Sequence, residues 1–158
     1  MEIEEYTSHD GCGLAALIRS GEVSADEVRD AALAAIERVQ PEINAVAGDP
    51  FRDGLAASSD GPLAGVPFGL KDLVCHAAGV PTWMGSRLTG PEGFVHEHDT
   101  ELMARFRRAG LVTVARTTTP EMGYNANTEA RVYGSTRNPH DLSRSAGGSS
   151  GGSGALVA

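Results

Sequence analysis

The sequence contains few cysteines, an excess of negative charge and no long apolar run. The two cysteines among 158 residues, Cys12 and Cys75, form no CxxC motif, which favours a reduced, cytoplasmic compartment over a secreted one. The net charge of −8 and the pI near 5.0 argue against a nucleic-acid or anionic-membrane surface, because both partners require clustered positive charge. No apolar run is long enough for a signal peptide or a membrane span. We therefore expect a soluble, cytoplasmic protein with no nucleic-acid and no membrane partner.

Lysine is rarer still. Of the 13 lysine and arginine residues, only Lys71 is a lysine. A buried lysine can give up its proton, whereas arginine stays charged, so a chain that otherwise uses arginine invites a chemical reason for lysine at this position. Composition alone leaves chance or an ordinary salt bridge equally open.

The chain has the length of one globular domain and should begin with helices. Its 41% of hydrophobic residues is enough for a core. The apolar spacing predicts a helix over Asp10–Arg19, with Gly21 as its stop. A capping box in Ser24–Glu27 opens a second helix, which Pro41 should end. Residues 1–43 are therefore expected to form an N-terminal helical hairpin.

The next segment places the lone lysine at the end of a buried strand. Asn44–Ala47 is a candidate short strand, and Phe51–Ala57 is a candidate short helix. The continuous apolar run Leu63–Leu70 is typical of a strand buried on both faces, and Lys71 follows it directly. Because neighbouring strand residues point to opposite faces, Asp72 is not the automatic partner of this lysine. Lys71 could therefore be buried without a neutralising neighbour.

A second helix and strand follow further along the chain. Asp99 can cap a helix that Gly110 closes, and Leu111–Ala115 is typical of a buried strand. This order is typical of an α/β sheet, in which ligands collect at the carboxyl ends of the strands. Thr117–Tyr124 begins at such an end and is therefore a candidate wall of a site, whereas Asn125–Pro139 should be polar loop. In the helix between Asp99 and Gly110, the residues expected to face the core are Leu102, Met103, Phe106 and Ala109.

The last stretch, Ser145–Gly154, is rich in glycine and serine. Such a composition places hydroxyl and bare N–H groups around one point. The stretch runs directly into the apolar Ala155–Ala158, the expected start of a buried helix, which argues against a flexible linker. It lacks the Gly-Lys-Ser/Thr end of a phosphate-binding loop, although its N–H groups could still hold an anion.

Two other arrangements of reactive side chains fit known sites poorly. His96 and His98 match no zinc signature, and Cys75 and His76 would project apart from an extended strand. The remaining candidates for a catalytic site are the serines of the glycine-rich stretch and Lys71. A lysine can take a proton from a serine only when it is neutral, which requires its pKa to fall roughly three units from about 10.4. Desolvation by the apolar Leu63–Leu70 could supply that fall.

Several motifs occur in order along the chain: Leu63–Leu73, Asp99–Leu102, Ala109–Gly110, Arg116–Met122, Gly134–Pro139 and Gly147–Ser153. Together they resemble the amidase signature family, and the resemblance covers nearly the whole chain. It implies an α/β fold in which helices flank a mixed central sheet behind the N-terminal helical hairpin. Family members are much longer, so residues 1–158 are expected to be the N-terminal part of a single amidase domain, with residues 44–158 as the start of its α/β core.

The resemblance also implies a Ser-cisSer-Lys triad. Lys71 matches the basic lysine of the family, and Ser149 matches the bridging serine that follows a cis peptide bond. Ser150 and Ser153 are expected to hold the turn and the helix start, and the alternative is a hydrogen bond to the loop or to the substrate. The acylated serine and the oxyanion hole lie further along in the family than this chain extends. The chain alone should therefore lack amide hydrolysis.

The expected reaction of the complete enzyme is hydrolysis of a small-molecule carboxamide through an acyl-enzyme, without a cofactor or metal. Met122, Gly123 and Asn125 are expected to line the acyl site. Pro120–Gly123 and Ser135–Pro139 are most similar to the branch acting on linear or cyclic aliphatic amides, such as 6-aminohexanoate cyclic dimer. Partners would be the rest of the domain and, as a further option, a second copy in a homodimer. The alternatives are the amidase subunit of a tRNA-dependent amidotransferase, and an inactive or anion-binding fragment.

Overall fold

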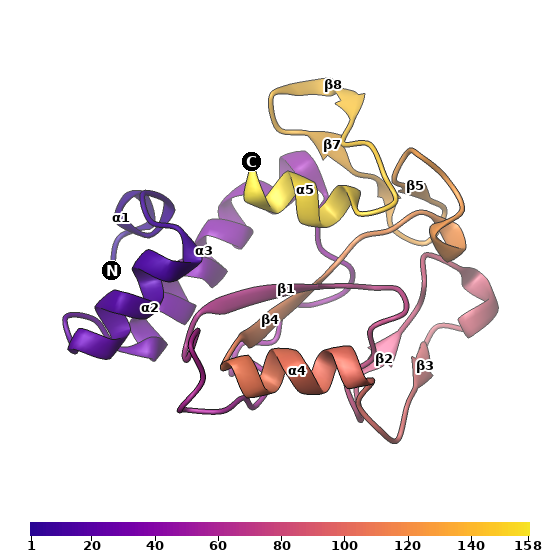
Figure 1. Ribbon diagram of the computed structural model, residues 1–158. Coiled ribbons are helices and arrows are strands. Elements are labelled where there is room, and N and C mark those ends of the chain that lie inside the picture. Colours follow the sequence, from indigo (N-terminus) through magenta and orange to yellow (C-terminus); the bar gives the residue numbers. More distant parts are fainter.

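The computed structural model describes residues 1–158 and begins with three helices (Figure 1). These are α1 (Ile3–Thr7), α2 (Gly11–Ser20) and α3 (Ala25–Ile43). Asp10 caps α2 by accepting a hydrogen bond from the Gly13 amide at 2.7 Å, and Gly21 ends this helix with a left-handed φ of 76°. Ser24 and Glu27 form the predicted capping box of α3. The two predicted helices are confirmed, and α1 is an addition that the sequence pattern did not indicate.

The prediction that Pro41 ends α3 is wrong, because the helix continues to Ile43. Proline lacks an amide donor and usually disrupts a helix interior, but this one lies in the last turn, where other contacts fix the end. Asn44 ends the helix with a left-handed φ of 50°. Its side chain donates to the carbonyls of Tyr133 and Ser135 at 2.7 and 3.2 Å. The end of α3 is therefore tied to a loop about 90 residues away in sequence.

Two strands and a helix form the centre of the fold: β1 (Pro67–Lys71), β4 (Val112–Thr117) and α4 (Glu101–Ala109). The strands are parallel, and Lys71 pairs with Thr117, so both strands end at the same edge. Helix α3 packs against β4 through Ile36, and α4 packs against β1 through the buried Met103. The predicted α/β class is confirmed, and β1 and β4 form a two-stranded parallel sheet.

The predicted strand Leu63–Leu70 is shorter than its apolar run. The amide of Val66 donates to the carbonyl of Leu63 at 3.1 Å, which closes a turn. Gly65 has a left-handed φ of 82° in the same turn. The glycine and proline that punctuate the run therefore delay the strand until Pro67.

The prediction of a short helix over Phe51–Ala57 is wrong. The Phe51 amide donates to the Val114 carbonyl at 2.7 Å, and the Leu55 amide donates to the Thr113 carbonyl at 2.9 Å. The edge of β4 offers backbone partners, and these bonds replace the internal bonds of a helix. The candidate strand Asn44–Ala47 is likewise reduced to a single antiparallel bridge, from Val46 to Thr117.

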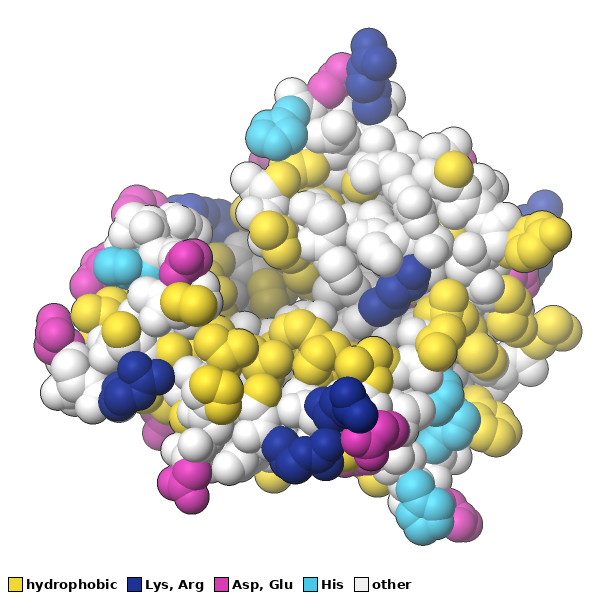
Figure 2. All heavy atoms as spheres, in the orientation of Figure 1, with side chains coloured by type: hydrophobic (Ala, Val, Ile, Leu, Met, Phe, Trp, Pro, Cys, Tyr) yellow, Lys and Arg dark blue, Asp and Glu magenta, His cyan; other side chains and the backbone are white.

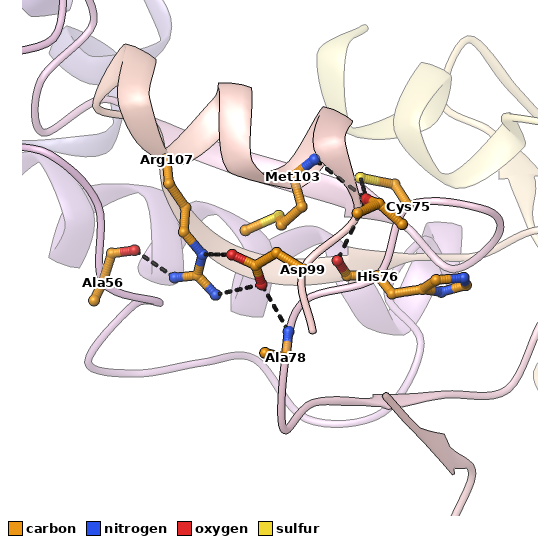
Figure 3. A network of polar contacts seen from close by, with 8 residues as sticks. Ala56, Cys75, His76, Ala78, Asp99, Met103 and Arg107 are labelled. Carbon is orange, nitrogen blue, oxygen red and sulfur yellow. Dashed lines mark hydrogen bonds and ion pairs between the residues drawn. The ribbon is translucent and has the colours of Figure 1, made fainter. Parts of the chain in front are cut away.

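The cap of α4 differs from the prediction by one residue. Thr100, not Asp99, accepts a hydrogen bond from the Met103 amide, at 3.3 Å. Asp99 instead binds Arg107 at 2.7 Å and accepts a hydrogen bond from the Ala78 amide at 2.7 Å (Figure 3). This network fastens the start of α4 to the loop that follows β1.

Leu102, predicted to face the core, is 49% exposed. Hydrophobic side chains gather in a band across the visible face of the molecule in Figure 2. Exposed apolar surface of this kind is typical of places that contact other molecules or segments. The prediction of a core position for Leu102 is therefore wrong for the surface that this chain presents.

Short antiparallel hairpins and a final helix complete the fold. They are β2 (Pro81–Thr82) with β3 (Phe94–Val95), β5 (Glu129–Ala130) with β6 (Gly134–Ser135), β7 (Arg137–Asn138) with β8 (Asp141–Ser145), and α5 (Gly151–Val157). Single 3-10 turns span Arg87–Thr89 and Glu121–Gly123. None of the helices combines the length and the apolar character needed to cross a bilayer.

Candidate active site

The carboxyl edge of the β1–β4 pair lies directly below the first turn of α5. The Gly152 amide donates to the Thr118 carbonyl at 3.2 Å, and a Cβ on Gly152 would lie 2.3 Å from the Thr118 nitrogen. Only glycine permits this approach. At the next residue of the helix, the hydroxyl of Ser153 lies 2.7 Å from the hydroxyl of Thr117. Ser153 therefore holds the helix against the strand, which agrees with the expected structural role of that serine.

This packing brings the lone lysine to the serines. Nζ of Lys71 lies 2.8 Å from Oγ of Ser149 and 3.0 Å from Oγ of Ser150. The peptide bond between Gly148 and Ser149 is cis. Burial lowers the pKa of the Lys71 ammonium, and both of its contacts are neutral hydroxyls. The site therefore holds an amine and two hydroxyls between which a proton can pass.

Ser150 differs from its expected structural role. It stands at the start of α5, but its side chain makes no cap hydrogen bond. The hydroxyl contacts Lys71 instead. The motif contains two adjacent serines, and the sequence offered no signal that both would reach the same amine.

Buried threonines hold in place residues 147–150, which we call the glycine–serine turn. Thr119 donates from Oγ1 to the carbonyl of Ser149 at 3.0 Å. Thr128 donates to the carbonyl of Gly147 at 2.8 Å and accepts from the amide of Gly151 at 3.2 Å. Both threonines are fully buried. Because their hydroxyls bond backbone atoms on either side of Ser149, they fix the position of this serine over the lysine.

The three residues expected to line the acyl site lie in the loop after β4. Met122 is 42% exposed and has a left-handed φ of 51°. Gly123 faces the serine, since a Cβ built on it would lie 3.8 Å from Cβ of Ser149. The Asn125 carbonyl faces Gly148, where an added Cβ would lie 2.9 Å from that oxygen. The loop therefore forms a wall beside the turn that carries Ser149.

A buried charge network, which the sequence analysis did not identify, lies behind the lysine. Asp72 has no exposed surface and accepts hydrogen bonds from the Trp83 amide at 3.1 Å and from the Tyr133 hydroxyl. Its carboxylate also pairs with Arg116 at 3.6 Å. Burial raises the pKa of Asp72, and these three partners oppose that rise. A carboxylate at the end of an apolar run was the available sequence signal, but its partners are 11 to 61 residues away.

The remaining histidine and cysteine side chains do not converge on a common centre. The rings of His76 and His96 stack with centroids 3.5 Å apart. No group of three or more histidine, cysteine, aspartate or glutamate side chains is arranged to hold a metal ion.

An α/β core with a lysine–serine pair at the start of a glycine-rich helix is the arrangement that the motif resemblance implied. The amidase family model matches residues 25–158. The chain therefore belongs to the amidase signature family.

The chain is also similar to individual members of this family. The chain is 44% identical over 151 residues to 6-aminohexanoate-cyclic-dimer hydrolase of Paenarthrobacter ureafaciens, covering 94% of this chain and 31% of that protein. It is 42% identical over 156 residues to a glutamyl-tRNA(Gln) amidotransferase subunit of Acidothermus cellulolyticus, covering 92% and 30%. A solved structure of 6-aminohexanoate cyclic dimer hydrolase matches with a TM-score of 0.85 at 42% identity, covering 96% of this chain and 32% of that one. The chain thus spans about a third of the length of these proteins.

Proposed function

We propose that this chain is the N-terminal part of an amidase domain and supplies the proton relay for carboxamide hydrolysis. The observation that carries the proposal is the 2.8 Å contact between Lys71 Nζ and Ser149 Oγ, with burial lowering the pKa of the lysine. A neutral amine can accept a proton from a hydroxyl, and a hydroxyl can pass one on. The two groups therefore have the chemistry of a base and a bridge.

In the proposed reaction, the nucleophilic serine comes from the part of the amidase domain that the relatives have and this chain does not span. Its proton moves to Ser149, and Ser149 gives its own proton to neutral Lys71. The serine oxygen attacks the carbonyl carbon and forms an acyl-enzyme. The protonated relay then returns a proton to the leaving amine. Water finally attacks the ester, and the serine leaves with its proton restored.

The proposed substrate is a linear or cyclic aliphatic amide. The relative that carries this proposal is the cyclic-dimer hydrolase, at 44% identity. The wall that Met122 and Gly123 form beside Ser149 supports it, because the methionine offers an exposed apolar surface to an acyl chain.

Replacing Lys71 with alanine in the full-length enzyme tests the relay. General base catalysis contributes about 10²- to 10⁴-fold, so kcat should fall by that factor. In the parent enzyme kcat/KM should rise with pH through a lysine pKa below its ordinary value, because only the neutral amine accepts a proton. Arg105→Ala, on an exposed side chain of α4, is the matched control. Activity of Lys71→Ala within tenfold of the parent would remove the lysine from the mechanism.

A second candidate is the amidase subunit of a tRNA-dependent amidotransferase, which the 42% identity to such a subunit favours. A protein of this kind would copurify with partner subunits and release ammonia from glutamine. A protein that purifies alone and hydrolyses aliphatic amides but not glutamine contradicts this candidate.

A further inference from the structure

Two facing turns carry backbone conformations that are unusual for their residues. We call residues 83–86 and 120–123 the paired turns. Met84 and Met122 have left-handed φ angles of 53° and 51°, and the glycine after each has φ of 63° and 68°. A left-handed conformation is unfavourable for a residue with a Cβ and persists where surrounding contacts determine it. The contacts between the two turns are therefore expected to be strong.

Two hydrogen bonds join the paired turns. The Met122 amide donates to the Met84 carbonyl at 2.8 Å. The Ser86 hydroxyl donates to the Glu121 carboxylate at 2.7 Å, and Ser86 has no exposed surface. The turns also touch through backbone, because a Cβ on Gly85 would lie 2.8 Å from the carbonyl oxygen of residue 120. Glu121 is thus the one acidic side chain that anchors the wall to a buried donor.

The paired turns also connect the two sides of the proposed site. At one end, the Trp83 amide donates to Asp72, the residue next to Lys71. At the other end, a Cβ on Gly123 would lie 2.3 Å from Cδ2 of Leu73 and 3.8 Å from Cβ of Ser149. A shift of turn 120–123 would therefore move the surface beside Ser149.

We propose that Glu121 is a positioning residue that sets acyl-chain selectivity by anchoring turn 120–123 on Ser86. The inference rests on the proposed function, in which Met122 lines the acyl site. A carboxylate accepting from a buried hydroxyl makes a strong hydrogen bond, and its removal leaves that donor without an acceptor. The backbone bond from Met122 to Met84 is then the only hydrogen bond left between the paired turns, and the apolar surface of Met122 is held less firmly beside the acylation point.

The test compares hexanamide with acetamide in the full-length enzyme. If Met122 lines the acyl site as proposed, the longer acyl chain of hexanamide should reach it, whereas the methyl group of acetamide should not. Glu121→Ala should raise KM for hexanamide about tenfold or more and change kcat/KM for acetamide less than about threefold. Glu121→Gln keeps an acceptor oxygen for Ser86. It should therefore retain the parent enzyme's ratio of kcat/KM for hexanamide to kcat/KM for acetamide. Ser86→Ala should reproduce the effect of Glu121→Ala.

The matched control is Ser143→Ala, which removes a hydroxyl–carboxylate bond of 2.6 Å to Asp141 on an exposed strand. It should leave both substrates unchanged. Equal losses on hexanamide and acetamide in Glu121→Ala, or a ratio lost in Glu121→Gln as well, overturn the positioning role. If Met122→Ala leaves the ratio of the two kcat/KM values unchanged as well, Met122 does not line the acyl site. Loss of acetamide turnover in Lys71→Ala tests the proton relay alone.

Discussion

Replacing Arg116 with methionine tests the buried charge network behind the proposed lysine base. Nη1 of Arg116 lies 3.6 Å from Oδ1 of Asp72, and the two side chains are 1% and 0% exposed. At an effective dielectric constant of about 20, unit charges at that distance attract by roughly 4 to 5 kcal/mol. Methionine keeps much of the aliphatic length of arginine, so the change removes charge more than packing.

The expected loss follows from leaving Asp72 buried without its cation. Breaking a buried ion pair by removing one partner costs about 3 to 5 kcal/mol, because the remaining charge stays desolvated. Two donors remain on Asp72, the Trp83 amide and the Tyr133 hydroxyl, so we expect the lower end of that range. The double variant Asp72→Leu/Arg116→Met should be more stable than Asp72→Leu alone, since it buries no unpaired charge.

Urea titration of the full-length enzyme, followed by tryptophan fluorescence, measures the loss as a lower midpoint. Arg38→Met is the control, because Arg38 pairs with Glu4 at 2.8 Å but the side chains are 54% and 76% exposed. An exposed pair is screened by water, so this variant should not shift the midpoint. If Arg116→Met shifts the midpoint no further than Arg38→Met does, the reasoning from burial is wrong.

Two other predictions concern the glycine–serine turn and the first turn of α5, which follows it. Ser150→Ala removes a hydrogen-bond acceptor that favours the charged form of Lys71, so the pKa of the lysine should fall. The acid limb of the kcat/KM profile should then move to lower pH, with a lower plateau. An acid limb that stays in place contradicts the contact. Gly152→Ala should destabilise the enzyme by about 3 kcal/mol or more in thermal unfolding, because its Cβ would meet the Thr118 nitrogen at 2.3 Å. Gly154→Ala in the same helix meets no atom within 4 Å and should be neutral or stabilising.

Local signals in the sequence predicted local structure well. The capping box Ser24–Glu27 and the stop at Gly110 depend on atoms within a few residues, and both occur in the structure. The unusual use of lysine at position 71 drew attention to the end of β1, where its amine contacts two serine hydroxyls. Its contact with Ser149 spans 78 residues and came from the family resemblance, since no periodicity relates two positions that far apart.

The misses share a cause, which is that distant partners decide the local conformation. Phe51–Ala57 has a plausible helical pattern, yet it bonds to the edge of β4. Helix α3 passes Pro41 because Asn44 is held by carbonyls from the β5–β6 region. The anchor between Glu121 and Ser86 is of the same kind, since 35 residues separate its two ends. Each contact is specific, but none leaves a pattern in a short window of sequence.

The different surroundings of Lys71 and Asp72 support the proposal that the lysine serves as a base. A carboxylate beside Lys71 would stabilise its ammonium and raise its pKa. Strand alternation instead turns Asp72 away, to the side where Arg116 and Tyr133 engage its charge. The lysine is left with the neutral hydroxyls of the glycine–serine turn. An arginine in its place would stay protonated in the same surroundings, so the proposed chemistry requires the lysine that the rest of the chain avoids.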